Sequence, residues 1–235
     1  MAASERLVSQ TPSGVSIRET GAFGLGLFAT KPFKKGTIIY ESSCLLTERN
    51  EVPDIDYEHF CVYDVERGKY QVYGFDRYMN HSCEPTCVTT DPTYVDGSLK
   101  YKMVMLRDIE PGEQLFEDYF NFEYDEMKIV DCRCGASSCR KTINGFKNLP
   151  LTEKLRRVNL CEASLIEQWA KDDPNVRLAE LPSERRQEFT GASGFFRQEF
   201  SEHDLSAESG RRPTAEEPTL LFKVNGRYVW SKTAR

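Results

Sequence analysis

Three short segments carry the side chains that are best suited to chemistry. The first is a polar turn at residues 80–85, Asn-His-Ser-Cys-Glu-Pro, which offers an amide, an imidazole and a thiol. The second is an acidic and aromatic run at residues 113–119, Glu-Gln-Leu-Phe-Glu-Asp-Tyr. The third is a cysteine cluster at residues 132–139. Each segment alone is common in chains of this size, so their order and spacing carry the argument.

The cysteine cluster favours a metal site. Cys132, Cys134 and Cys139 place three thiols among polar, flexible residues, whereas buried core thiols have apolar neighbours. A closed structural zinc site requires four ligands, so the fourth must come from elsewhere in the chain. The candidates are five other thiols and one imidazole: Cys83, Cys87, Cys44, Cys61, Cys161 and His81.

The other candidate segments are ambiguous by themselves. The turn at 80–85 is typical of a polar loop whose side chains bond to local backbone, and Tyr119 is typical of an aromatic cluster. The glycine-rich stretch around Gly24, Leu25 and Gly26 lacks the strand-helix-strand pattern of a dinucleotide site. Its glycines either form a plain turn or let the backbone approach a ligand closely.

The pattern of apolar residues predicts the elements that position these segments. Short β-branched and aromatic runs, separated by Gly, Pro, Asn and Asp, predict strands at 15–17, 27–29, 37–40, 70–73 and 101–106. From Leu151 to Ala170 the helical spacing predicts an amphipathic helix with a break near Asn159. A short helix at 182–189, a linker at 201–218 and a hairpin around Asn225-Gly226, with strands 219–224 and 227–230, follow.

Composition sets the class of protein. A chain of 235 residues with 39% hydrophobic residues is long enough for one domain with a substantial core, or for one domain plus an appendage. The net charge of -6 gives no strong nucleic-acid signal and is compatible with a basic substrate. No apolar stretch spans a membrane and no secretory signal pattern is present, so we expect an intracellular protein, nuclear or cytoplasmic. In that setting eight cysteines are not expected to form a disulfide framework.

Together the motifs resemble those of SET-domain protein-lysine N-methyltransferases with a post-SET zinc loop. Four signatures occur in the family's order: Gly-x-Gly at 24–26, Asn-His-Ser-Cys-x-Pro at 80–85, Glu-x-Leu-x-x-Asp-Tyr at 113–119 and Cys-x-Cys-x4-Cys at 132–139. The resemblance implies a mainly β fold of small curled sheets with a pseudoknot-like crossing. The resemblance covers residues 13–150, as a SET domain at 13–124 and a post-SET zinc loop at 125–150. The polar, patternless residues 1–12 are expected to form a flexible tail, and residues 151–235 a C-terminal extension without a counterpart in the family. The extension is expected to be helical, followed by the linker and the hairpin.

The resemblance assigns roles to residues. S-adenosyl-L-methionine would be held by Gly24, Leu25, Gly26, Asn80, His81, Tyr119 and Phe146. Tyr119 would lie at the point of methyl transfer, and Phe146 would close over cofactor and substrate. Zinc would be bound by Cys83, Cys132, Cys134 and Cys139. The implied substrate is a lysine amine in a protein or peptide, with a histone tail as one option. A non-histone protein, a small amine or a non-catalytic interaction module are the alternatives.

Two positions depart from the family pattern. Thr86 follows Pro85 where the family usually has Asn, so a contact in the turn is either weakened or replaced. Ser42 stands where a tyrosine of the lysine channel is common. The channel is then wider, accepts a different amine, or takes an aromatic wall from Tyr40, Tyr73 or Tyr78.

Overall fold

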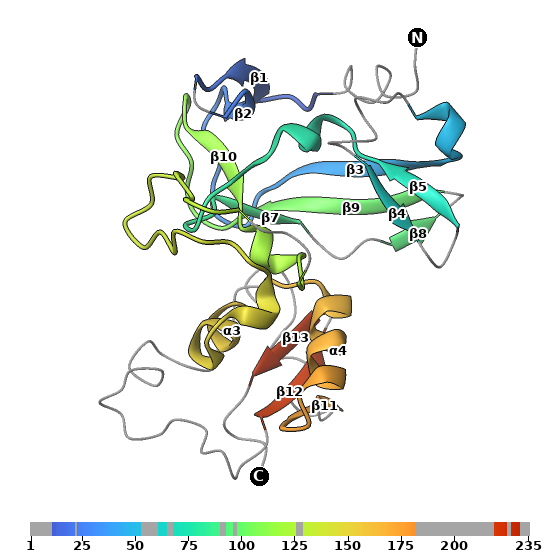
Figure 1. The fold of residues 1–235 in the computed structure, drawn as a ribbon. Helices are drawn as coiled ribbons and strands as arrows, with labels where there is room; N and C mark the ends of the chain where they lie inside the picture. Colours follow the sequence, from blue (N-terminus) through green and yellow to red (C-terminus); the bar gives the residue numbers. More distant parts are fainter. Residues whose placement is uncertain are drawn as a thin grey trace. The chain divides into compact units, whose positions relative to one another are not determined.

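The structure is a computed structural model that describes residues 11–21, 23–52, 61–64, 68–89, 93–95, 98–125, 129–181, 219–224 and 227–230. The chain forms two compact units (Figure 1). The first comprises residues 1–118 with 134–139, and the second comprises residues 119–133 with 140–235. The predicted helix at 182–189, the linker at 201–218 and residues 1–10 of the tail lie outside the described residues.

A four-stranded sheet in the first unit joins segments that are far apart in the sequence. Its strands, in spatial order, are β1 (Val15–Glu19), β2 (Leu25–Ala29), β10 (Gln114–Glu117) and β6 (Asn80–His81). Strand β10 pairs antiparallel with β2 and parallel with β6. Phe116 is the register partner of Asn80, and Glu117 is the partner of His81. The sheet therefore brings the predicted turn and the predicted acidic run together.

A second sheet in the same unit has the order β4 (Cys61–Asp64), β5 (Lys69–Val72), β3 (Ile38–Thr47), β9 (Ser98–Met105) and β7 (Cys87–Thr89), with β8 (Thr93–Val95) paired to β9. Strands β3 and β9 run antiparallel beside each other (Figure 1). Two short 3-10 helices, η1 (Arg49–Glu51) and η2 (Phe75–Tyr78), accompany the sheet. The segment η2 follows β5 and leads into β6, so it connects the second sheet to the polar turn.

The core of the first unit follows from the alternation of side chains along the strands. Leu27, Ala29 and Leu115 are fully buried, while their neighbours in the strands turn to the other face of the sheet. The remaining core residues come from both sheets and their connections, namely Val15, Phe33, Phe75, Met79, Cys87, Met103, Met105 and Ile109. Because each buried large apolar side chain contributes roughly 1.5–3 kcal/mol, this cluster fixes the strands that carry the motifs.

The second unit contains the predicted helical segment and its break. Its first elements are η3 (Tyr119–Asn121), η4 (Phe146–Asn148), α3 (Leu151–Arg157) and α4 (Ala163–Asp172). The break that we predicted near Asn159 is confirmed, since neither α-helix covers residues 158–162. Leu165, Ile166 and Trp169 form the buried face of α4. Within the described residues, no helix is long and apolar enough to cross a membrane.

The C-terminal extension contains more strand than the sequence predicted. The hairpin strands β12 (Thr219–Val224) and β13 (Arg227–Trp230) are confirmed with the predicted bounds, while their turn at 225–226 lies outside the described residues. An unpredicted strand, β11 (Val176–Glu180), pairs parallel with β12. Its alanine and glutamate have low β propensity, so the local sequence gives no strand signal. With these sheets and short helices, the prediction of a mainly β fold is confirmed.

Candidate functional site

The polar turn and the glycine-rich strand meet at Asn80. Its side-chain Nδ2 donates to the carbonyl oxygen of Leu25 at 3.0 Å. The preceding Gly24 has a φ of +67°, which glycine adopts without strain. The carbonyl oxygen of Gly24 accepts hydrogen bonds from the backbone N–H and the hydroxyl of Thr20, at 2.8 and 2.9 Å. Three predicted cofactor-binding residues, Gly24, Leu25 and Asn80, are thus neighbours.

Gly26 leaves room that any side chain would fill. A Cβ at this position would lie 2.5 Å from Nε2 of Gln114, 2.7 Å from the methyl group of Thr20 and 3.1 Å from Nδ2 of Asn80. Among the described residues, Nε2 of Gln114 is buried without a hydrogen-bond partner. Such a donor costs about 1–3 kcal/mol, which a ligand with an acceptor atom would recover. The residues here therefore fit a polar cofactor whose acceptor atom approaches close to the backbone.

The imidazole of His81 contacts a different set of residues from Asn80. Its Nδ1 lies 3.7 Å from Oδ1 of Asp118, and its Nε2 lies 3.4 Å from Sγ of Cys83. Both side chains of the His81–Asp118 pair are buried, with exposed fractions of 6% and 1%. The side chains of Asn80 and His81 point in opposite directions because successive residues of a strand face opposite sides of the sheet. The predicted part of His81 in cofactor binding stays a prediction.

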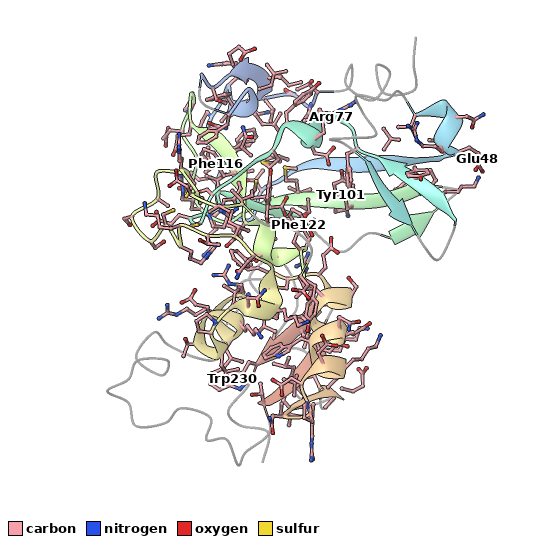
Figure 2. All side chains as sticks on the ribbon, in the orientation of Figure 1. Glu48, Arg77, Tyr101, Phe116, Phe122 and Trp230 are labelled. Atoms are coloured by element: carbon pink, nitrogen blue, oxygen red, sulfur yellow. The ribbon has the colours of Figure 1, made fainter. Side chains whose placement is uncertain are left out.

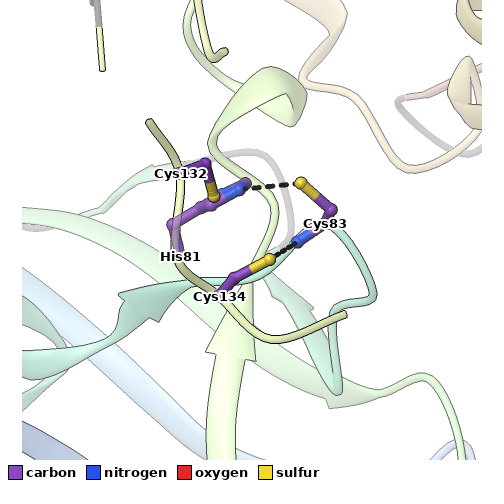
Figure 3. A group of neighbouring side chains, drawn as sticks. All are labelled: His81, Cys83, Cys132 and Cys134. Atoms are coloured by element: carbon purple, nitrogen blue, oxygen red, sulfur yellow. Dashed lines mark hydrogen bonds between the residues drawn. The ribbon is translucent and has the colours of Figure 1, made fainter. Parts of the chain in front are cut away.

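A group of thiols surrounds that imidazole (Figure 3). The ligand atoms of His81, Cys83, Cys132 and Cys134 all lie within 4.8 Å of one another. The backbone N–H of Cys83 also donates to Sγ of Cys134 at 3.4 Å. Thiolates and imidazoles are the donors that zinc prefers in tetrahedral sites, so this set fits zinc. Three of the four predicted zinc ligands belong to the group, and the ligand role of Cys139 stays a prediction.

The other candidate thiols differ in their surroundings. Cys87 is fully buried in the core, and its Sγ donates to a backbone carbonyl oxygen at 3.3 Å. Burial, with a smaller contribution from the charge of Glu117, raises the pKa of the Cys87 thiol far above its ordinary value. Because zinc binds the thiolate, Cys87 is a poor ligand. Cys161 is buried in the second unit, and the side chains of Cys44 and Cys61 are outside those that the structure describes.

Thr86, at the position where the family usually has Asn, forms hydrogen bonds with Phe116 of β10. Its backbone N–H donates to the carbonyl oxygen of Phe116 at 3.0 Å. Its hydroxyl oxygen accepts from the backbone N–H of Phe116 at 2.7 Å and lies 3.2 Å from the same carbonyl oxygen. Phe116 lies on β10 and is the register partner of Asn80 at the start of the turn. The hydrogen bonds of Thr86 therefore hold the end of the same turn on β10.

Two predicted cofactor-binding residues, Tyr119 and Phe146, belong to the second unit. Tyr119 begins η3, is partly buried and has its ring centroid 5.4 Å from that of Phe122. Phe146 is fully buried, and its ring centroid lies 5.4 Å from Trp169 and 6.5 Å from Tyr124. These contacts fix the orientation of both rings within the second unit. The catalytic role of Tyr119 and the closing role of Phe146 stay predictions.

Tyr101 is an aromatic residue that the sequence reasoning missed. The register of β3 and β9 pairs Ser42 with Tyr101; Figure 2 labels Tyr101 on β9. The Tyr101 side chain is buried, packs with Tyr73 and donates its hydroxyl to the carboxylate of Asp76. Only the pairing of the strands reveals this neighbour, because position 101 is distant from position 42 in the sequence.

Comparison with known proteins shows what this part of the chain is similar to. Residues 24–120 match the family model of the SET domain. The chain is 36% identical over 137 residues to the histone-lysine N-methyltransferase trr of Drosophila melanogaster, covering 52% of this chain and 5% of that protein. It is 35% identical over 154 residues to the histone-lysine N-methyltransferase 2D of Homo sapiens, covering 59% of this chain and 3% of that protein.

A fungal relative matches over a shorter segment. The H3 lysine-4 specific histone-lysine N-methyltransferase of Emericella nidulans is 42% identical over 72 residues, covering 30% of this chain and 6% of that protein. The chain thus spans only 3% to 6% of the length of these three relatives.

Proposed function

Because residues 24–120 match the family model of the SET domain, we propose that the chain is an S-adenosyl-L-methionine-dependent methyltransferase that modifies lysine side chains in a protein substrate. The observation that carries this proposal is the approach of the Asn80 and Gln114 amides to the space beside Gly26. Within this proposal, residues 13–124 are the catalytic domain and residues 125–150 are the zinc loop. The extension at 151–235 has no assigned part in the reaction.

The cofactor is proposed to bind along the start of β2. Gly24, Leu25 and Gly26 would present backbone groups, and Asn80 would present its side-chain amide, which the hydrogen bond to Leu25 already orients. The unpartnered Nε2 of Gln114 supports a cofactor acceptor atom at the same place. When bound, the cofactor would supply an activated methyl group on a sulfonium centre.

The chain's own part in the reaction is to position an amine and to favour its neutral form. A lysine attacks only as the neutral amine, and a narrow apolar channel lowers the pKa of lysine by desolvation. We assign the hydroxyl of Tyr119 to hold the amine in line for attack, because correct orientation removes much of the barrier. The packing of Tyr119 on Phe122 supports a fixed ring. Tyr101, opposite Ser42, is proposed to supply the aromatic wall that Ser42 lacks.

Zinc is proposed to bind Cys83, Cys132, Cys134 and Cys139. His81 would then act as a neighbour that orients the Cys83 thiolate, since its Nε2 is 3.4 Å from that sulfur. Partners of this kind fix the geometry of the ligands that they contact. The metal would tie the cysteine loop to the turn that carries Asn80, so that the cofactor site and the loop form together.

The substrate is proposed to be a histone tail. The three relatives described above are named histone-lysine N-methyltransferases, and one is named for lysine 4 of histone H3. A net charge of -6 is compatible with a basic peptide of this kind. Action on histones would place the protein in the nucleus. A small amine or a non-histone protein is the second candidate, favoured by the departure at Ser42.

Calorimetric titration of zinc-loaded protein with S-adenosyl-L-methionine tests the cofactor site. We expect binding, and we expect Gly26→Ala to weaken it about tenfold, because the new methyl group displaces the Gln114 and Asn80 amides. Gly21→Ala controls for a strained glycine substitution away from these amides, since its φ of +76° disfavours any side chain while its Cβ meets nothing within 4 Å. Its cofactor affinity is expected to stay that of the unaltered protein. An absence of cofactor binding by the unaltered protein would support the non-catalytic alternative instead.

A further inference from the structure

Glu84 connects the polar turn to the cysteine loop without any metal. One carboxylate oxygen, Oε1, accepts three hydrogen bonds: from the hydroxyl of Ser137 at 2.8 Å, from the backbone N–H of Ser138 at 3.0 Å and from the hydroxyl of Ser138 at 2.8 Å. Glu84 directly follows Cys83, and both serines lie between Cys134 and Cys139. The same carboxylate thus links segments that carry proposed ligands.

A second link strengthens this connection. The backbone N–H of Cys83 donates to Sγ of Cys134 at 3.4 Å. The backbone N–H of Glu84 donates to the hydroxyl of Ser82 at 3.1 Å, which fixes the local turn and aims the Glu84 side chain. Cys83 and Cys134 are 51 residues apart in the sequence, so a flexible chain would have to close a long loop for zinc to join them.

We propose that Glu84 is a positioning residue for the zinc site, which holds the loop at 134–139 against the turn at 80–85 before the metal binds. This inference rests on the proposed zinc site, but it concerns a residue that is not itself a ligand. Holding the two segments together lowers the entropy cost of ordering them when zinc binds, as preorganisation does in other binding sites. It also keeps the thiols close together, so zinc leaves more slowly.

The acceptor chemistry of Glu84 defines the variants that test its role. An ionised carboxylate only accepts hydrogen bonds, and bonds to it are roughly twice as strong as those between neutral groups. Glu84→Gln keeps an acceptor oxygen at the same place without the charge, whereas Glu84→Ala removes the acceptor. If the three hydrogen bonds hold the loop, the rate of zinc release from Glu84→Gln will lie between those of the unaltered protein and Glu84→Ala.

Release of zinc to a chromogenic chelator is the main measurement. We expect zinc to leave Glu84→Ala about tenfold faster than the unaltered protein, and to leave Glu84→Gln about threefold faster. Glu48→Ala is the matched control, because its exposed carboxylate forms an ion pair with Lys69 at 3.7 Å and, in the part of the chain that the structure describes, has no hydrogen bond to the cysteine loop. The control is expected to release zinc at the unaltered rate. Equal rates for Glu84→Ala and the unaltered protein would overturn the proposal.

Hydrogen exchange in the zinc-free protein tests the link itself. The amide of Ser138 is expected to exchange more slowly in the unaltered protein than in Glu84→Ala. Exchange at the same rate in both proteins would overturn the proposal, whatever the zinc data show. Neither measurement requires methyl transfer. A protein that shows the expected zinc release and amide exchange but no methyltransferase activity would contradict the proposed function and leave the role of Glu84 intact.

Discussion

Replacing Tyr119 with phenylalanine is expected to lower the turnover number by about 100-fold or more while leaving the cofactor Kd within about twofold. The variant loses only the hydroxyl that we assign to positioning the amine. Its ring keeps the same packing against Phe122, whose centroid lies 5.4 Å away, so the fold is expected to persist. Steady-state kinetics with a histone peptide, together with calorimetry of cofactor binding, give the two values.

The control for this substitution is Tyr228→Phe. Tyr228 lies on β13, and its hydroxyl donates to Oε1 of Glu167 at 3.0 Å, within the C-terminal extension. Removing that hydroxyl is expected to leave turnover unchanged. Equal losses of turnover and cofactor affinity in Tyr119→Phe would contradict the role assigned to Tyr119, because they would indicate a damaged cofactor site.

Removal of zinc is the second change with a large expected effect. Cys134→Ser is expected to reduce both zinc content and turnover, the latter by at least the roughly 100-fold that loss of an outer-shell partner can cost. The reason is structural, since metal binding and local folding are coupled at such sites. Atomic absorption measures the zinc content, and the methylation assay measures the turnover.

The matched control is Cys87→Ala, which removes a thiol that lies in the apolar core. Its zinc content is expected to remain that of the unaltered protein. Two further variants distinguish the proposed fourth ligand from its neighbour. Cys139→Ser is expected to lower zinc affinity more than His81→Ala. The reverse order would assign His81, which the structure groups with three thiols, as the ligand in place of Cys139.

Local sequence patterns predicted the elements whose residues alternate clearly or whose ends carry strong signals. The pair Asn225-Gly226 marked a hairpin, and both flanking strands have the expected bounds. The helical spacing after Leu151 and its interruption gave α3 and α4. Strand β11 was not predicted from the sequence, because its stability comes from pairing with β12, which lies about forty residues later in the chain.

Motifs predicted which segments meet, but not the side chains that fasten them. The parallel register of Phe116 with Asn80 agrees with the expectation that the turn and the acidic run form one site. The hydrogen bonds of Thr86 to Phe116, and those of Glu84 to the serine pair, depend on the three-dimensional approach of distant segments. No spacing within the sequence encodes these contacts, so they emerge only once the chain is folded.

The most direct test of the central claim is a transfer assay read by mass spectrometry. Zinc-loaded protein is incubated with S-adenosyl-L-methionine that carries a deuterated methyl group, and with histone octamers and histone H3 tail peptides. We predict labelled methyl groups on a lysine side-chain nitrogen, and their loss in Tyr119→Phe. A protein that binds the cofactor but leaves every lysine unlabelled would contradict the assignment of lysine methylation on histones.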